Sequence, residues 1–132
     1  MSTDLKMLAW TAGFTLLLWL PYILARMMAS GIVPTLTYAA DKDPLPPWAE
    51  RAKKAHYNAI ENLAPFAAVV LVAHLAGAAS ATTAGAAVIF FWARVVHYFG
   101  AISGLPFIRT LSFAVGWVAT LVIFWAIISK PM

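Results

Sequence analysis

The chain contains no cysteine, and only 11% of its 132 residues are charged. Without cysteine there can be no disulfide, no thiolate metal site and no cysteine nucleophile. A soluble domain has roughly a quarter of its residues charged, because charged side chains cover its surface. Here 63% of the residues are hydrophobic and the mean hydropathy is +0.83. This apolar surplus indicates that much of the protein surface faces lipid.

The charges that are present carry a basic excess, with nine Lys and Arg against five Asp and Glu. A nucleic-acid-binding protein would need these basic residues in a patch exposed to solvent. In this sequence they lie beside or within apolar segments, which argues against a nucleic-acid partner. The N-terminal segment lacks the pattern of a secretory signal, so we expect its long apolar run to remain as a membrane helix.

Four apolar stretches are long enough to cross a membrane. A spanning helix needs about 20 mainly apolar residues, because the hydrocarbon core is roughly 30 Å thick. The predicted helices cover about residues 5–28, 48–77, 82–103 and 107–129. Pro21 is expected to kink the first, and none of the runs has the short alternating pattern of a spanning β-barrel. We therefore expect an all-α integral membrane protein, a four-transmembrane-helix bundle that forms one domain over residues 1–132.

The positions of Lys and Arg predict the orientation of this bundle. Four spans place both termini and the second connection on one side of the membrane, and the first and third connections on the other. The latter side carries six basic residues, namely Arg26, Lys42, Arg51, Lys53, Lys54 and Arg109. The former side carries Lys6 and Lys130. Because loops rich in Lys and Arg stay in the cytoplasm, we expect the long first connection to be cytoplasmic and both termini to lie outside.

Three of the predicted helices carry polar residues that a simple membrane anchor would not need. In the second helix, polar side chains three or four residues apart share one face, and these are Arg51, Lys54, Asn58, Glu61 and Asn62. The third helix adds Arg94 and His97 on one face, and the fourth adds Arg109 in its first turn. With the predicted topology, all of these residues lie in the cytoplasmic half of the membrane.

Such a group of polar residues predicts a functional site, because a charged side chain deep in a membrane helix costs roughly 2.5–3.5 kcal/mol. Arg94 and Glu61 could offset part of this cost as a pair, with the other polar side chains lining a hydrated pocket. The alternative is an ion pair that only joins helices, but a single pair would suffice for that. We interpret Lys53 as an interfacial residue whose charge reaches the membrane surface.

The histidines outside this group give little support for a metal site. His56 lies on a different face of its helix from Asn58 and Glu61, and we expect it to contact a neighbouring helix or subunit. His74 lies near the outer end of the same helix. Because a metal site needs three convergent ligands, we predict that the protein holds no metal.

Two sequence blocks carry a family resemblance. The first is RAKKAHYNAIENLAPF at residues 51–66, and the second combines ARVVHY at 93–98 with GLPFIRT at 104–110. They resemble the helix-two signature and the helix-three to helix-four segment of the MAPEG family, the membrane-associated proteins in eicosanoid and glutathione metabolism. The chain looks like a bacterial-type member similar to the microsomal glutathione transferases. This resemblance implies a homotrimer, located in the inner membrane of a bacterium.

The resemblance also implies that glutathione is the co-substrate and binds at subunit interfaces toward the cytoplasmic face. Arg109 matches the arginine that stabilises the glutathione thiolate in the enzymes of this family. The positions implied to bind glutathione or to organise its pocket are Arg51, Lys54, Asn58, Glu61, Arg94 and His97. A basic, partly desolvated cleft suits this anionic tripeptide, because charge-assisted hydrogen bonds are strong.

The sequence departs from the glutathione-using members at several positions. Tyr57 and Lys54 each stand where those members have an arginine, and Ala101 and Phe113 stand where they have tyrosines. The leading hypothesis is a membrane-bound glutathione transferase or peroxidase, acting on lipophilic electrophiles that enter from the surrounding lipid. One alternative is a non-enzymatic family member that binds lipid or acts as a scaffold. Another is a small four-helix transporter.

Overall fold

The structure, a computed structural model, describes residues 1–131 and has four helical segments long and apolar enough to span a membrane. The first span, Thr3–Ser30, is made of α1 (Thr3–Leu17) and α2 (Leu20–Ser30). The other three are α4 (Pro47–Leu75), α5 (Ala81–Ser103) and α6 (Ile108–Ile128). The predicted all-α fold with four membrane-spanning helices is confirmed, and the protein is an integral membrane protein.

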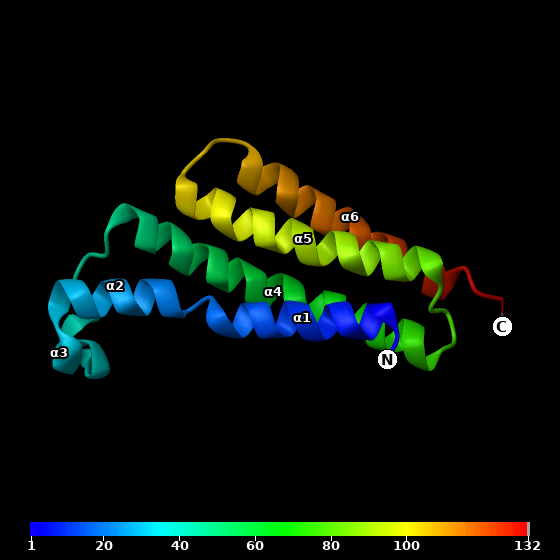
Figure 1. The fold of residues 1–132 in the computed structure, drawn as a ribbon, viewed down its shortest axis with the longest axis horizontal. Coiled ribbons are helices and arrows are strands. Elements are labelled where there is room, and N and C mark those ends of the chain that lie inside the picture. The colour runs from blue at the N-terminus through cyan, green and yellow to red at the C-terminus, as the bar shows by residue number, and fades with distance from the viewer. Residues whose placement is uncertain (132) are drawn as a thin grey trace.

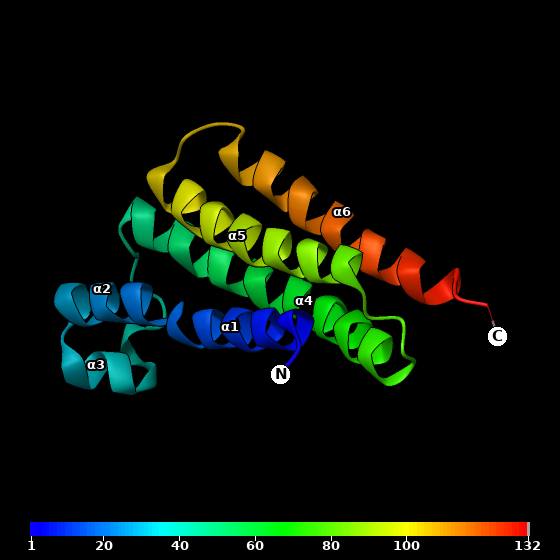
Figure 2. The ribbon, with the colours of Figure 1, turned by 45° about the vertical axis from the view of Figure 1, so that its right-hand side comes forward.

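The four spans pack side by side as a bundle (Figures 1 and 2). Helix α5 packs against α1, α4 and α6, and α4 also packs against α1 and α6. The first span and α6 therefore lie on opposite sides of the α4–α5 pair. Both termini and the connection between α4 and α5 lie at one end of the bundle, and the other two connections lie at the opposite end (Figure 1). Every consecutive pair of spans is thus antiparallel.

The first span is broken at Leu18 and Trp19, close to the predicted kink. Pro21 follows at the start of α2, where it has no N–H to donate to the carbonyl four residues earlier. The carbonyl of Leu18 accepts a hydrogen bond from the hydroxyl of Tyr98 in α5 at 3.2 Å. Polar backbone groups in hydrocarbon need such partners within the protein. The side chain from α5 therefore makes the break tolerable inside the membrane.

The long first connection contains more structure than its sequence predicted. A short helix α3 (Ile32–Leu36) and a 3₁₀ turn η1 (Tyr38–Ala40) follow Gly31. The connection is tied back onto the first span by Asp43, whose carboxylate accepts from Ser30 at 2.8 Å and whose carbonyl accepts from Arg26. These contacts hold the segment against the end of the bundle that lies farthest from the termini.

The opposite end is held by two polar contacts that the sequence did not predict. Asp4 is buried, and its carboxylate accepts a hydrogen bond of 2.6 Å from the hydroxyl of Thr83, at the start of α5. The ammonium of Lys130 donates to the carbonyls of Ala76 and Gly77 at 2.8 and 2.6 Å. The positive charge suits the end of α4, where unpaired carbonyls gather. Asp4 is thereby attached to the start of α5, and Lys130 to the end of α4 and its connection to α5.

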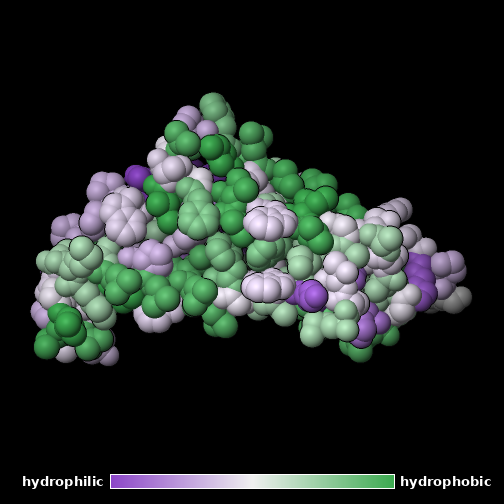
Figure 3. Space-filling view, in the orientation of Figure 1, coloured by the Kyte–Doolittle hydropathy of each residue, from purple (hydrophilic) through white to green (hydrophobic). Residues whose placement is uncertain are grey.

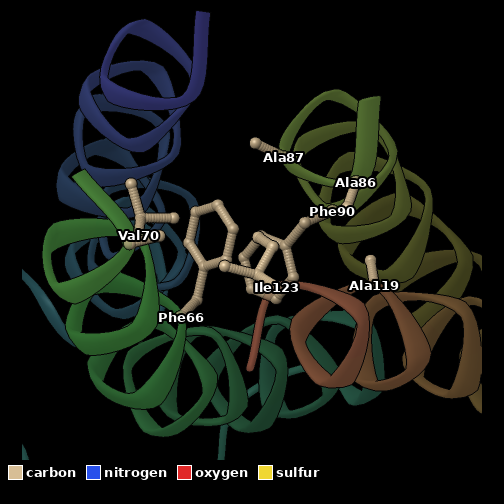
Figure 4. Packing of buried hydrophobic residues seen from close by; sticks show 8 residues of the cluster. Phe66, Val70, Ala86, Ala87, Phe90, Ala119 and Ile123 are labelled. Atoms are coloured by element: carbon tan, nitrogen blue, oxygen red, sulfur yellow. The ribbon is translucent and has the colours of Figure 1, made fainter. Parts of the chain in front are cut away.

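One hydrophobic core lies between α4, α5 and α6 (Figure 4), and a second lies between the first span, α4 and α5. Phe66 and Phe90 stack with ring centroids 3.8 Å apart and planes 10° from parallel. Val70 and Ile123 surround them, and all four side chains are buried. Outside the core, large apolar side chains are exposed on every span, and they cover most of the middle of the face in Figure 3. A surface of this kind is stable in lipid and not in water.

Helices α5 and α6 approach each other most closely at Gly100. A methyl group built at this position would lie 2.5 Å from Cγ2 of Ile108 in the first turn of α6. Glycine is therefore required at position 100, because any side chain there would displace the start of α6.

Gly100→Ala should destabilise the protein by about 1–3 kcal/mol, as expected for an overpacked position. The measurement is the thermal unfolding midpoint in detergent. Gly85→Ala is the matched control in the same helix, because no neighbouring atom lies within 4 Å of the added methyl group and alanine favours a helix. Its midpoint should not fall. Equal midpoints for the two variants would contradict this account of the α5–α6 contact.

Candidate functional site

A cleft of about 330 Å³ opens between α4, α5 and α6, toward the end of the bundle that holds the α5–α6 connection. Five of the predicted site residues line it, and these are Arg51, Lys54, Asn58, His97 and Arg109. Small or apolar groups and one hydroxyl complete its wall, from Ala55, Ala101, Thr110 and Phe113. Residues far apart in sequence thus meet in one cleft.

Helix α4 presents its cleft residues through simple periodicity. Arg51, Lys54 and Asn58 are three and four residues apart, so they lie on one face. Ala55 lies between them on the same face and leaves open space, because its side chain is a single methyl group. Lys54 is exposed, whereas Arg51 and Asn58 are half-buried. The cleft therefore runs from an accessible cationic mouth to a more enclosed polar floor.

Arg51 links α4 to the end of α5. Its Nε donates to the carbonyls of Ala101 and Ile102 at 3.1 Å each, and its Nη2 donates to Ile102 at 2.9 Å. A helix ends with unpaired carbonyls, and a cation is well placed to satisfy them. Gly104, with φ of 72°, ends α5 in the left-handed conformation. Part of the predicted glutathione-binding capacity of Arg51 is thus used within the protein.

The start of α6 brings Arg109 to the cleft. Phe107 precedes the helix with φ of 71°, the only positive φ of a non-glycine residue among the described residues. Such strain is found where the surroundings hold a turn in place, often at functional sites. Arg109 follows two residues later and is exposed. It lines both the main cleft and an adjoining cavity of about 180 Å³ beneath the α5–α6 connection.

Arg94 lies behind the cleft. It is 2% exposed and is not among the residues lining the cavity. Its Nη2 donates to Oδ1 of Asn58 at 2.6 Å and lies 3.4 Å from Nδ1 of His97. The predicted pairing of Arg94 with Glu61 is not what the structure has. Asn58, one turn earlier on α4, takes the position facing Arg94.

Glu61 lies outside the cleft, although its sequence position predicted a place in the pocket. Its side chain is exposed on the surface of the single chain. Asn62, next to it, turns inward instead and donates to the carbonyl and Oδ1 of Asn58 at 2.8 and 3.3 Å. Neither residue lines the cavity. The floor of the cleft is therefore built by the amide of Asn58 and the imidazole of His97, with the buried guanidinium of Arg94 behind them.

The other histidines do not take part in the cleft. His56 contacts α2, where its Nδ1 lies 2.8 Å from the hydroxyl of Tyr22, in agreement with the expected contact to a neighbouring helix. His74 is exposed near the end of α4. Over residues 1–131, no group of three or more His, Cys, Asp or Glu side chains could hold a metal ion.

Two cleft residues were missed by the sequence analysis. Ala55 lies four residues after Arg51, so helical periodicity alone could have placed it on the same face. Thr110 directly follows Arg109 in the first turn of α6. Its place beside a predicted site residue was the available signal.

These features define a class of protein, a four-span integral membrane protein with a basic cleft buried among three of its spans. The model of the MAPEG family matches residues 7–129. The chain belongs to the MAPEG family, which includes glutathione transferases and related proteins. No curated protein and no solved structure matches the chain. The family resemblance of the two sequence blocks is thereby confirmed over nearly the whole chain.

Arg51 and Lys54 lie on one face but should differ in their contribution to stability. Arg51→Met should lower the free energy of unfolding by about 1–3 kcal/mol, because it leaves the carbonyls at the end of α5 without their charged donor. Lys54→Met removes the same charge from an exposed side chain, so it should change stability by less than about 0.5 kcal/mol. Thermal unfolding in the same detergent compares them. A Lys54 variant as unstable as the Arg51 variant would contradict the assigned contacts.

Proposed function

We propose that this protein is a membrane-bound glutathione transferase or peroxidase that acts on lipophilic electrophiles. The observation that carries the proposal is the convergence of Arg51, Lys54, Asn58, His97 and Arg109 on one cleft within the spans. Glutathione has two carboxylates and a thiol, so it matches a cleft that offers several cationic or hydrogen-bonding groups. Membership of a family that includes glutathione transferases supports the same conclusion.

Arg109 is the residue proposed to stabilise the glutathione thiolate. The α5–α6 turn places Arg109 at the start of α6, where it lines the cleft, and a positive charge near the sulfur favours the ionised thiol. In conjugation the thiolate attacks an electrophilic carbon, a C–S bond forms, and the leaving group departs with the electron pair of the broken bond. Arg51, Lys54, Asn58 and His97 hold the peptide so that its sulfur stays close to Arg109.

The lipophilic substrate is proposed to enter from the lipid rather than from water. Phe113 and Ala101 form an apolar part of the cleft wall, and α6 exposes large apolar side chains such as Leu111 and Trp117. A molecule dissolved in the membrane could reach the sulfur without crossing an aqueous phase. The thiolate and its electrophile would thus approach the cleft from different phases.

The cleft wall also favours a second candidate, a family member that binds a lipid without catalysis. Ala101 and Phe113 line the cavity at positions where the resemblance implies tyrosines. Fewer hydroxyls are then available to hold a tripeptide. Calorimetry separates the candidates, because the transferase requires glutathione binding and the lipid-binding protein does not. No heat of binding at millimolar glutathione would favour the second candidate.

Arg109→Ala should lower kcat/KM for conjugation of glutathione to a chromogenic electrophile by at least about 100-fold, as expected when a preorganised charge at the reacting atom is lost. Lys6→Ala removes a positive charge at the opposite end of the bundle and serves as the control with unchanged activity. Size-exclusion chromatography should show the same assembly for both variants. Full activity in the Arg109 variant would contradict its role.

The exposed charges on α4 and α6 support a further part of the proposal, a homotrimer with its long connection in the cytoplasm. Glu61 and Arg109 are exposed in the single chain, and Glu61 lies about four turns into a spanning helix. Facing lipid there, a charge would cost roughly 2.5–3.5 kcal/mol. Further copies of the chain would cover these groups, and the trimer is the assembly that the resemblance implies.

Native mass spectrometry from lipid nanodiscs should therefore give the mass of three chains. Because the chain has no cysteine, one introduced at Lys42 or at Lys130 is the sole thiol for labelling with a membrane-impermeant reagent. In intact spheroplasts the Lys130→Cys variant should label and the Lys42→Cys variant should not. A monomer would contradict the assembly, and labelling only at position 42 would reverse the orientation.

A further inference from the structure

The network behind the cleft contains an arginine whose role differs from that of the lining residues. Arg94 does not line the cavity, yet it contacts two residues that do, Asn58 at 2.6 Å and His97 at 3.4 Å. We propose that Arg94 is a positioning residue, which orients the Asn58 amide and the His97 imidazole so that both donate hydrogen bonds into the cleft.

The orientation of Asn58 follows from its hydrogen-bond partners. Its Oδ1 accepts from Nη2 of Arg94 at 2.6 Å and from Nδ2 of Asn62 at 3.3 Å. Both partners are donors, and a guanidinium has no acceptor. A flipped amide would place its NH₂ group against two other donors. The amide oxygen of Asn58 is therefore held toward Arg94, and its NH₂ group is the part left for a ligand.

The tautomer of His97 follows from the same argument. A guanidinium nitrogen can only donate to Nδ1, so Nδ1 must be the unprotonated nitrogen of a neutral ring. The proton then resides on Nε2, and the hydrogen bond at one ring nitrogen determines the role of the other. His97 is 3% exposed, so a ligand in the cleft can reach only a small part of the ring. The protonated Nε2 can donate a hydrogen bond to such a ligand.

Both free donors reach the cleft. Among the described residues, the only buried side-chain nitrogen or oxygen without a hydrogen-bond partner is Nε of Arg94. The NH₂ group of Asn58 and the Nε2 of His97 therefore retain accessible surface, and the cavity is the surface that these two residues line.

The consequence is a cleft whose charged and amide groups all donate. Arg51, Lys54 and Arg109 have no acceptor, and Asn58 and His97 are turned to act as donors. Such a lining favours a ligand rich in acceptors, such as a peptide with ionised carboxylates. This inference rests on the proposed function for the identity of the ligand, but the orientation itself is a property of the protein without ligand.

The orientation is tested first without ligand, by ¹⁵N NMR of the full chain labelled at histidine in nanodiscs. The His97 signals are identified by their loss in His97→Gln. Nδ1 should resonate as an unprotonated nitrogen and Nε2 as a protonated one. Arg94→Met should raise the Nδ1–H population at least about threefold, whereas Arg26→Met, which changes an arginine outside the cleft, should leave it unaltered.

A predominant Nδ1–H tautomer in the unaltered protein would overturn the proposal, even if Arg94→Met does not fold. A folded Arg94→Met protein with an unchanged spectrum would also overturn it.

The second measurement uses glutathione as the probe. Asn58→Asp keeps an acceptor for Arg94 but puts a carboxylate oxygen where the NH₂ group was. The protein should stay folded, and its Kd for glutathione should rise at least about tenfold, because like charges then meet. Unchanged affinity in this variant would overturn the proposal. Absence of glutathione binding by the unaltered protein, together with the expected His97 tautomer, would instead refute the proposed function and leave the role of Arg94 standing.

Discussion

The constraint on which the rest of this structure depends is the absence of water in the hydrocarbon layer. Each polar group in a span must find its partner within the protein. The Leu18 carbonyl finds Tyr98, Arg94 finds Asn58 and His97, and Arg51 finds the carbonyls that end α5. These contacts connect spans that apolar side chains also pack together. Polar side chains therefore add to the packing that holds these faces of the helices together.

The cleft follows from the same constraint. Three alanines on one face of α4 are buried, Ala49, Ala52 and Ala59, and they let neighbouring helices approach closely, as small residues do in membrane proteins. On the adjacent face of α4, Arg51 and Asn58 hold α5 by hydrogen bonds instead. The alanine face of α4 packs against its neighbours, and the face with Arg51 and Asn58 forms hydrogen bonds to α5. A polar space is left between α4, α5 and α6. An anion is the ligand that would compensate its charge.

Much of this arrangement was predictable from the sequence. Apolar length defined the spans, and the short connection at Gly104 made α5 and α6 neighbours. The predicted depth of Arg51, His97 and Arg109 in the membrane also indicated that they lie together. The depth of a residue does not determine, however, how its helix is rotated about its own axis. Asn58 and Glu61 differ by about 60° around the helix axis, and only the packing of α4 on α5 decides which one meets Arg94. The helix α3 and the 3₁₀ turn η1 are too short to leave a periodic signal in the sequence.

The bond between Tyr98 and Leu18 bears on how the protein is made. The two residues are 80 positions apart, and chains are synthesised at about 5–20 residues per second. Tyr98 is therefore synthesised roughly 4–16 s after Leu18, and only then can its hydroxyl donate to the Leu18 carbonyl. During that time the carbonyl at the break needs another partner, such as water at the insertion machinery. Biosynthesis of this protein thus favours late release of the first span into the lipid, after the third has arrived.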